Sequence, residues 1–148
     1  KNNKGRTIKK RVRKAKMTPV LSSKSKKFIE ENSTIHSDEL VSKLWNKFTR
    51  LTLVHKQAKE RITIDYDLKY NNHKTVALSN LVIGEVKQDK YTAHSDFIQL
   101  MRKTRIYPMR ISKYCIGAVL LFKELKYNLF KPKLLMLKKL GHENITIV

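Results

Sequence analysis

The sequence predicts an α+β fold, in which short strands form a sheet and helices flank it. The clearest sign is residues 60–70 (ERITIDYDLKY), where apolar and polar side chains alternate with the period of a strand. A second sign is the helical spacing of apolar residues in 93–105, followed by 113–122, which are apolar almost all round. The chain has 148 residues, the size of one ordinary domain, so we expect a single domain over residues 1–148.

The N-terminal part predicts a turn at residues 1–5 (KNNKG) and a strand over 6–14, where cations alternate loosely with apolar residues. Residues 15–37 are rich in Ser and Lys and predict a loop, with one helical turn near 26–31. A turn that opens a hairpin needs a strand before it. We therefore expect the sequence to be incomplete at its N-terminus.

Residues 38–48 (DELVSKLWNKF) predict a helix, because their apolar residues fall on one stripe and Ser37 or Asp38 supplies a cap. Strands are then expected on either side of a turn at 56–59. The expected elements after residue 48 can be given in order. They are strands at 50–56, 60–70 and 81–88, a polar turn at 71–74, helices at 93–105 and 113–122, and a short helix after Pro132.

The charge balance is the strongest compositional signal. Lys and Arg number 33 against 12 acidic residues, a formal net charge of +21. Such a surface favours a polyanion, which can be nucleic acid, anionic lipid, polyphosphate or a nucleoside triphosphate. No apolar run is long enough to predict a membrane span. One cysteine, Cys115, excludes an internal disulfide framework, and five scattered histidines do not predict a zinc site.

Polar side chains on the predicted strands indicate where the chemistry lies. Strict alternation places Arg61 and Lys69 on one face of their strand, while Glu85 and Lys87, two residues apart, share a face of theirs. A sheet that curls such a face inward would form a polar tunnel. Inward Arg and Lys bind phosphate oxygens, and an inward Glu can hold a hard divalent cation that bridges phosphates. An ordinary surface ion pair explains the same pattern.

A second cationic group precedes the helix expected at 113–122. Ser112 is its predicted N-cap, with Arg110 just before and Lys113 in the first turn, which together would form an anion site at a helix N-terminus. A plain capped helix with incidental cations is the alternative. A cation at a helix start is unfavourable without an anionic partner, and this favours the anion site.

The segments ERITIDYDL, LVIGEVKQ, RISKYCIGA and LKYNLFK, in this order and spacing, resemble the VTC domain. This is the polyphosphate polymerase domain of the triphosphate tunnel metalloenzyme superfamily, related to the CYTH phosphatases, and the chain is most similar to its bacterial type. The resemblance covers residues 50–130 and extends to 1–14. It implies an antiparallel β tunnel of about eight strands, flanked by helices and here lacking its N-terminal strands.

The resemblance also implies roles for individual residues. Arg61, Lys87 and Lys113 would be catalytic, and Glu85 would bind the metal, Mn²⁺ or Mg²⁺. For the first strand the alignment is uncertain by one residue, so Lys10 stays an alternative there. The phosphate-binding residues would be Lys9, Arg11, Arg61, Lys87, Arg110, Ser112 and Lys113.

The activity implied by the resemblance is transfer of the terminal phosphoryl group of ATP to a growing polyphosphate chain. A tunnel triphosphatase, in which water attacks instead, uses the same residues and stays open. A non-catalytic binder of nucleic acid or polyphosphate is the third hypothesis. The sequence shows no aromatic platform on which bases could stack, so we do not expect specific nucleic-acid binding. We expect ATP and polyphosphate as ligands, and a cytoplasmic location, at the inner face of a membrane where a membrane-protein partner is present.

Overall fold

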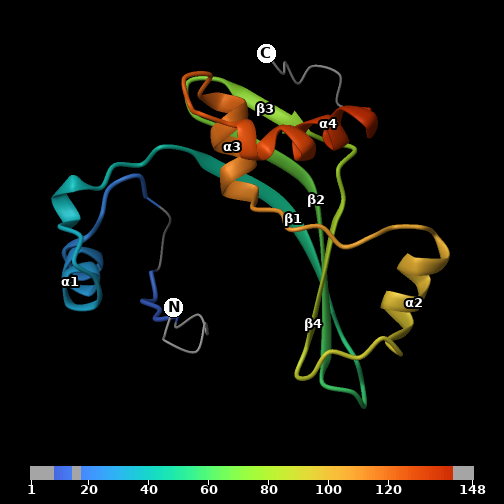
Figure 1. Cartoon of the computed structure of the whole chain (residues 1–148). Helices are drawn as coiled ribbons and strands as arrows, with labels where there is room; N and C mark the ends of the chain where they lie inside the picture. Colours follow the sequence, from blue (N-terminus) through green and yellow to red (C-terminus); the bar gives the residue numbers. More distant parts are fainter. Residues whose placement is uncertain (1–8, 15–17, 142–148) are drawn as a thin grey trace. The chain divides into compact units, whose positions relative to one another are not determined.

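The computed structural model describes residues 9–14 and 18–141, which Figure 1 draws in colour. The chain forms two compact units, Lys1–Lys43 and Leu44–Val148. Each unit is described on its own below, and the expectation of a single domain stays a prediction.

The first unit is built around one helix. Helix α1 spans Ser23–Asn32, and the Ser22 hydroxyl caps it by accepting a hydrogen bond from the Ser25 backbone N–H at 3.3 Å. A short 3₁₀ helix, η1, spans Ser37–Glu39. It is tied to α1 by an ion pair between Lys26 and Asp38 at 2.5 Å. The helical turn predicted near 26–31 is therefore part of a longer helix.

Two sequence predictions near the N-terminus are wrong. Residues 9–14 form no strand, and the rest of the strand expected over 6–14 lies outside the described residues. The helix expected over 38–48 is absent too, because strand β1 begins at Trp45 and pairs with a neighbouring strand. Cross-strand pairing outweighs the helical stripe, two of whose members, Leu40 and Val41, are exposed.

The second unit contains a four-stranded antiparallel sheet (Figure 1). Strand β2 (Glu60–Asn71) is central and pairs along its length with β1 (Trp45–Val54). On its other side, β2 pairs with β3 (Thr75–Leu78) at one end and β4 (Ile83–Gln88) at the other. The α+β class and the antiparallel sheet are confirmed. Strand β3 was not expected, and the sheet is open in the described part of the chain.

A bulge divides β2 into two halves. Lys47 lies opposite Lys69, but Thr49 lies opposite Tyr66, so two residues of β2 face one residue of β1. One of the two is Asp67, whose φ of 54° is in the left-handed region that Asp tolerates better than most residues. The bulge reverses the alternation, so Lys69 does not share a face with Arg61 as strict alternation predicts.

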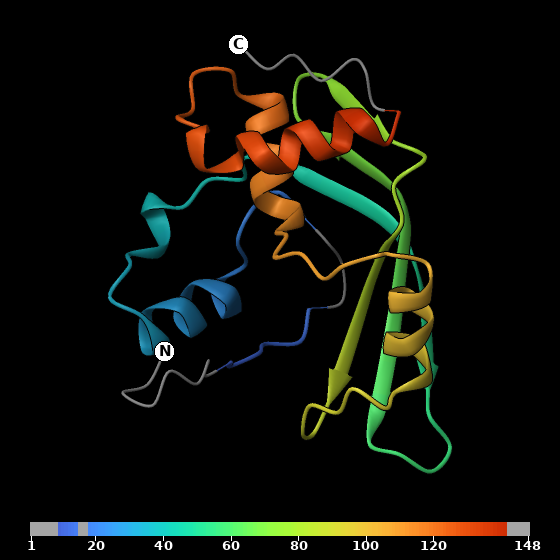
Figure 2. The ribbon, with the colours of Figure 1, turned by 45° about the vertical axis from the view of Figure 1, so that its right-hand side comes forward.

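Helices flank this sheet, as expected, and they pack on both of its faces. Helix α2 spans Asp96–Lys103 and α3 spans Lys113–Leu121, while the 3₁₀ helix η2 (Asn128–Phe130) leads into α4 (Lys131–Lys139). Figure 2 shows α3 and α4 at the same end of the sheet as β3. No helix among the described residues has the length and apolar character needed to cross a membrane.

The core lies under α3 and α4. Its most deeply buried side chains include Tyr70 from β2, Ile116 from α3 and Leu137 from α4. Gly117 lets α3 approach β2 closely, since a Cβ atom there would lie 2.3 Å from Cδ1 of Tyr70. On the opposite face of the sheet, Phe97 of α2 packs against Gly84 of β4.

Candidate phosphate-binding site

The strand register brings several predicted site residues onto one face of the sheet. Arg61 of β2 lies directly opposite Lys87 of β4, and Thr63 lies directly opposite Glu85. Residues directly opposite in an antiparallel pair project from the same face. On the β1 side, Arg50 lies opposite Asp65 on this face. We call this surface the polar face, formed by Arg50, Thr52, Arg61, Thr63, Asp65, Glu85 and Lys87.

The pairing of Arg61 with Lys87 is electrostatically unfavourable by itself. Like charges directly opposite on neighbouring strands destabilise a sheet. Lys87 is partly compensated, because its Nζ lies 3.1 Å from Oε1 of Glu85. The Arg61 side chain is exposed and makes no hydrogen bond or ion pair within the described part of the chain. This end of the polar face therefore offers free cationic donors to an anion.

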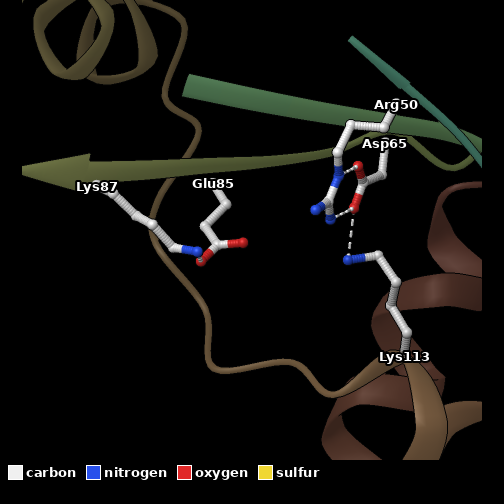
Figure 3. Close-up of polar contacts among 5 residues, drawn as sticks. All are labelled: Arg50, Asp65, Glu85, Lys87 and Lys113. Atoms are coloured by element: carbon white, nitrogen blue, oxygen red, sulfur yellow. Dashed lines mark hydrogen bonds and ion pairs between the residues drawn. The ribbon is translucent and has the colours of Figure 1, made fainter. Parts of the chain in front are cut away.

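The other end of the polar face holds a compact ion-pair cluster (Figure 3). Asp65 accepts hydrogen bonds from Nε and Nη2 of Arg50, at 2.6 and 2.7 Å. Its Oδ2 also lies 2.6 Å from Nζ of Lys113, at the start of α3. The hydrogen bonds from Arg50, and then those from Lys113, lower the pKa of the Asp65 carboxyl to about 2, although burial opposes this shift.

An aromatic ring supports both cations of this cluster. The guanidinium of Arg50 and the ammonium of Lys113 each lie 5.2 Å from the ring centroid of Phe48, on β1. Cations at this distance are attracted by the ring quadrupole. The ring and the carboxylate of Asp65 together restrict where the two cations can lie.

Thr63 lies between the two cationic ends of the polar face. Its side chain is only 5% exposed, and its hydroxyl has no hydrogen-bond partner in the described structure. A buried hydroxyl without a partner is unfavourable. Like the pairing of Arg61 with Lys87, this feature is not explained by the stability of the sheet.

The three residues predicted to form an anion site at the start of α3 make different contacts. The Ser112 hydroxyl caps α3 as predicted, accepting from the Cys115 backbone N–H at 3.3 Å. Lys113 turns toward Asp65, and Arg110 is exposed without an ion pair among the described residues. Lys9 and Arg11 are exposed and belong to the first unit, so their phosphate-binding role stays a prediction.

Two charged residues of the polar face, Arg50 and Asp65, were not among the predicted site residues. The signal that could have found them is the turn expected at 56–59. If His55 and Glu60 close that turn, counting back along both strands places Arg50 opposite Asp65. The structure has this closure, with the His55 backbone N–H donating to the Glu60 carbonyl at 3.0 Å.

The carboxylates of the polar face can be tested as ligands for a divalent cation. No three His, Cys, Asp or Glu side chains converge to form a metal centre among the described residues. Asp65 uses both oxygens on Arg50 and Lys113, whereas Glu85 pairs through one oxygen only. Mg²⁺ is usually held by one or two carboxylates together with substrate phosphates. Glu85 therefore fits a divalent cation that a phosphate ligand shares.

Comparison with known proteins identifies the family of this chain. No curated protein and no solved structure matches it with significant similarity. The sequence model of the VTC domain matches residues 2–122, which is most of the chain and includes every residue of the polar face. That family is associated with phosphoryl transfer in polyphosphate synthesis. The chain belongs to the VTC domain family.

Proposed function

We propose that this chain is a polyphosphate polymerase domain, which transfers the terminal phosphoryl group of ATP to polyphosphate on the polar face. The observation that carries the proposal is the pair of like charges, Arg61 opposite Lys87, on an exposed part of the sheet. A phosphate chain would offset their repulsion. Family membership supports the same conclusion.

The residues of the polar face would act by binding and by electrostatic stabilisation. Arg61 offers a planar fork to two phosphate oxygens, while Lys87 acts as a point charge. In the reaction, a terminal oxygen of the acceptor chain attacks the γ-phosphorus of ATP, the bond from that phosphorus to the β–γ bridging oxygen breaks, and ADP leaves. Cations on the transferred group stabilise this charge redistribution, so losing one would lower the rate by about 10²–10³-fold.

A divalent cation, Mn²⁺ or Mg²⁺, belongs to the proposal as well. Glu85 would hold it, and the ion would neutralise charge on the phosphate oxygens. Carboxylate oxygens are ligands that such hard cations prefer. The location in the cytoplasm, with a membrane-protein partner, stays a prediction.

The test uses the full chain incubated with ATP and MnCl₂, with polyphosphate resolved on a gel and ADP and free phosphate measured in parallel. Glu85→Gln and Arg61→Gln are the test variants. Lys69→Gln is the matched control, because it removes one cation from β2 on the opposite face of the sheet. Polymer is expected from the wild type and from Lys69→Gln, and is expected to be lost in the other two.

Other outcomes separate the alternatives. ADP and free phosphate without polymer would identify a triphosphatase and contradict polymer synthesis. No turnover, combined with metal-independent binding of polyphosphate that falls steeply with salt, would identify an electrostatic binder. Equal activity in Arg61→Gln and the wild type would remove the polar face from the reaction.

A further inference from the structure

Arg50 and Lys113 share the carboxylate of Asp65, whose side chain is 3% exposed. This carboxylate lies beside the guanidinium of Arg50, and the ammonium of Lys113 approaches it from another side (Figure 3). Asp65 comes from the middle of the sheet and Lys113 from the first turn of α3. The buried carboxylate of Asp65 therefore connects the polar face to α3, the helix that covers the adjacent end of the sheet.

The two cations keep most of their hydrogen-bond donors. Arg50 has five N–H donors and spends one from Nε and one from Nη2 on Asp65, while Lys113 spends one of three. The Arg50 side chain is 41% exposed, and that of Lys113 is 19% exposed. Both side chains therefore keep unused donors together with some exposed surface, so an anion can bind without breaking the existing bonds.

We propose that Asp65 is a positioning residue, which holds Arg50 and Lys113 side by side so that their free N–H groups bind one phosphate group together. Two cations this close repel each other, and the shared carboxylate offsets that repulsion while leaving the cluster with a net charge of +1. Phe48 limits their movement from the side. The inference rests on the proposed function, because it assigns a second phosphate position to the same polar face.

The alternative is that Asp65 only neutralises its two partners. The two roles predict opposite changes in anion affinity when the charge of Asp65 is removed, so the direction of that change tests the proposal. If Asp65 merely neutralised Arg50 and Lys113, it would compete with phosphate, and removing its charge would tighten anion binding. If it positions them, removing its charge weakens anion binding even though the protein becomes more positive. The side-on contact with Arg50, which leaves the outer donors free, favours positioning.

The experiment measures binding of inorganic tripolyphosphate to the full chain by calorimetry at fixed salt. Asp65→Asn is expected to weaken binding by about tenfold or more, as for the loss of a charged hydrogen-bond network. Asp65→Glu restores the carboxylate and is expected to recover part of the affinity. Asp67→Asn is the matched control, because Asp67 is exposed, makes no ion pair in the described structure and has a positive φ that Asn also tolerates.

Binding by Asp65→Asn as tight as the wild type, or tighter, would overturn the positioning role. If Asp65→Asn does not fold, as judged by circular dichroism, Arg50→Lys replaces it. That variant keeps the charge but loses the two-point contact, and weaker binding is expected, whereas unchanged binding would overturn the proposal. The Arg61→Gln variant distinguishes a failure of the positioning role from a failure of the proposed function. If Arg61→Gln weakens binding and Asp65→Asn does not, only the positioning role fails. If the wild type binds no tripolyphosphate, the proposed function fails.

Discussion

The two halves of β2 differ on one and the same face of the sheet: one half is buried in the core and the other is exposed and polar. In the half that pairs with β3, Leu68 and Tyr70 are 2% and 0% exposed and pack under α3. In the half that pairs with β4, Arg61 points from the same face and is exposed. Asp65 lies between the halves and is buried by its own ion pairs. The difference arises from where α3 begins, at Lys113, and not from the direction of the side chains.

The bulge at Asp67 makes this arrangement possible. With strict alternation, Leu68 would lie on the opposite face from Asp65. The extra residue reverses the alternation, so the core residues and the polar face lie on one side of the sheet. A single helix, α3, can therefore both close the core and supply Lys113 to the ion-pair cluster.

The largest expected effect is loss of core packing at the β3 end. Leu68→Ala should lower the free energy of unfolding by about 2–5 kcal/mol, because it removes buried apolar volume and leaves a cavity. Urea unfolding followed by circular dichroism measures the change. Leu53→Ala is the control on β1, where the side chain is 47% exposed and a loss below about 1 kcal/mol is expected. Equal losses would mean that the two halves do not differ in packing.

A smaller loss is expected where α3 approaches β2. Gly117→Ala places a methyl group 2.3 Å from the Tyr70 ring, and the helix or the ring must shift. The expected loss in unfolding free energy is about 1–3 kcal/mol, as for other overpacked cores. Gly84→Ala contacts Phe97 at 3.1 Å on the other face, and its effect should stay within about 1 kcal/mol. Thermal unfolding of both variants makes the comparison, and a larger loss for Gly84→Ala would contradict it.

Asp65, at the boundary between the two halves of β2, should make the free energy of unfolding depend on pH. The pKa of Asp65 is lowered from 3.8 to about 2 in the folded chain, so folding favours its ionised form. The stabilisation is complete above pH 3.8 and is lost as the pH falls toward about 2, for a total of about 2 kcal/mol. Urea unfolding at a series of pH values from 5 down to about 2 measures it. The Asp65→Asn variant should lose this component and Asp67→Asn should keep it, while identical curves for all three proteins would show that Asp65 contributes nothing.

Local patterns predicted much of the second unit. Alternation located β2 and β4, and the apolar run after Ser112 located α3 with its cap. The predicted helix over 38–48 failed because its aromatic residues Trp45 and Phe48 fit a strand equally well once β2 is beside them. Strand β3 was missed because its four residues are too few to show a period.

For the candidate site, spacing alone placed Glu85 and Lys87 on one face, and the register now puts Arg61 directly opposite Lys87. The family resemblance predicted from short segments is confirmed, while the individual roles of the site residues stay predictions. The turn at 56–59 could have placed Arg50 opposite Asp65, but the contact of Asp65 with Lys113 was beyond prediction, because α3 is distant from β2 in sequence.

Residues close together in the chain are enough to specify the excess of positive charge, the alternation along β2 and the cap of α3. Which cations are free and which are paired depends on the packing of strands and helices against one another. Lys113 and Arg61 look alike as basic residues in the sequence, yet the carboxylate of Asp65 holds Lys113, and Arg61 projects to solvent. The reason is physical: an ion pair forms between side chains that the fold brings within a few ångströms, and their distance along the chain does not reveal that contact.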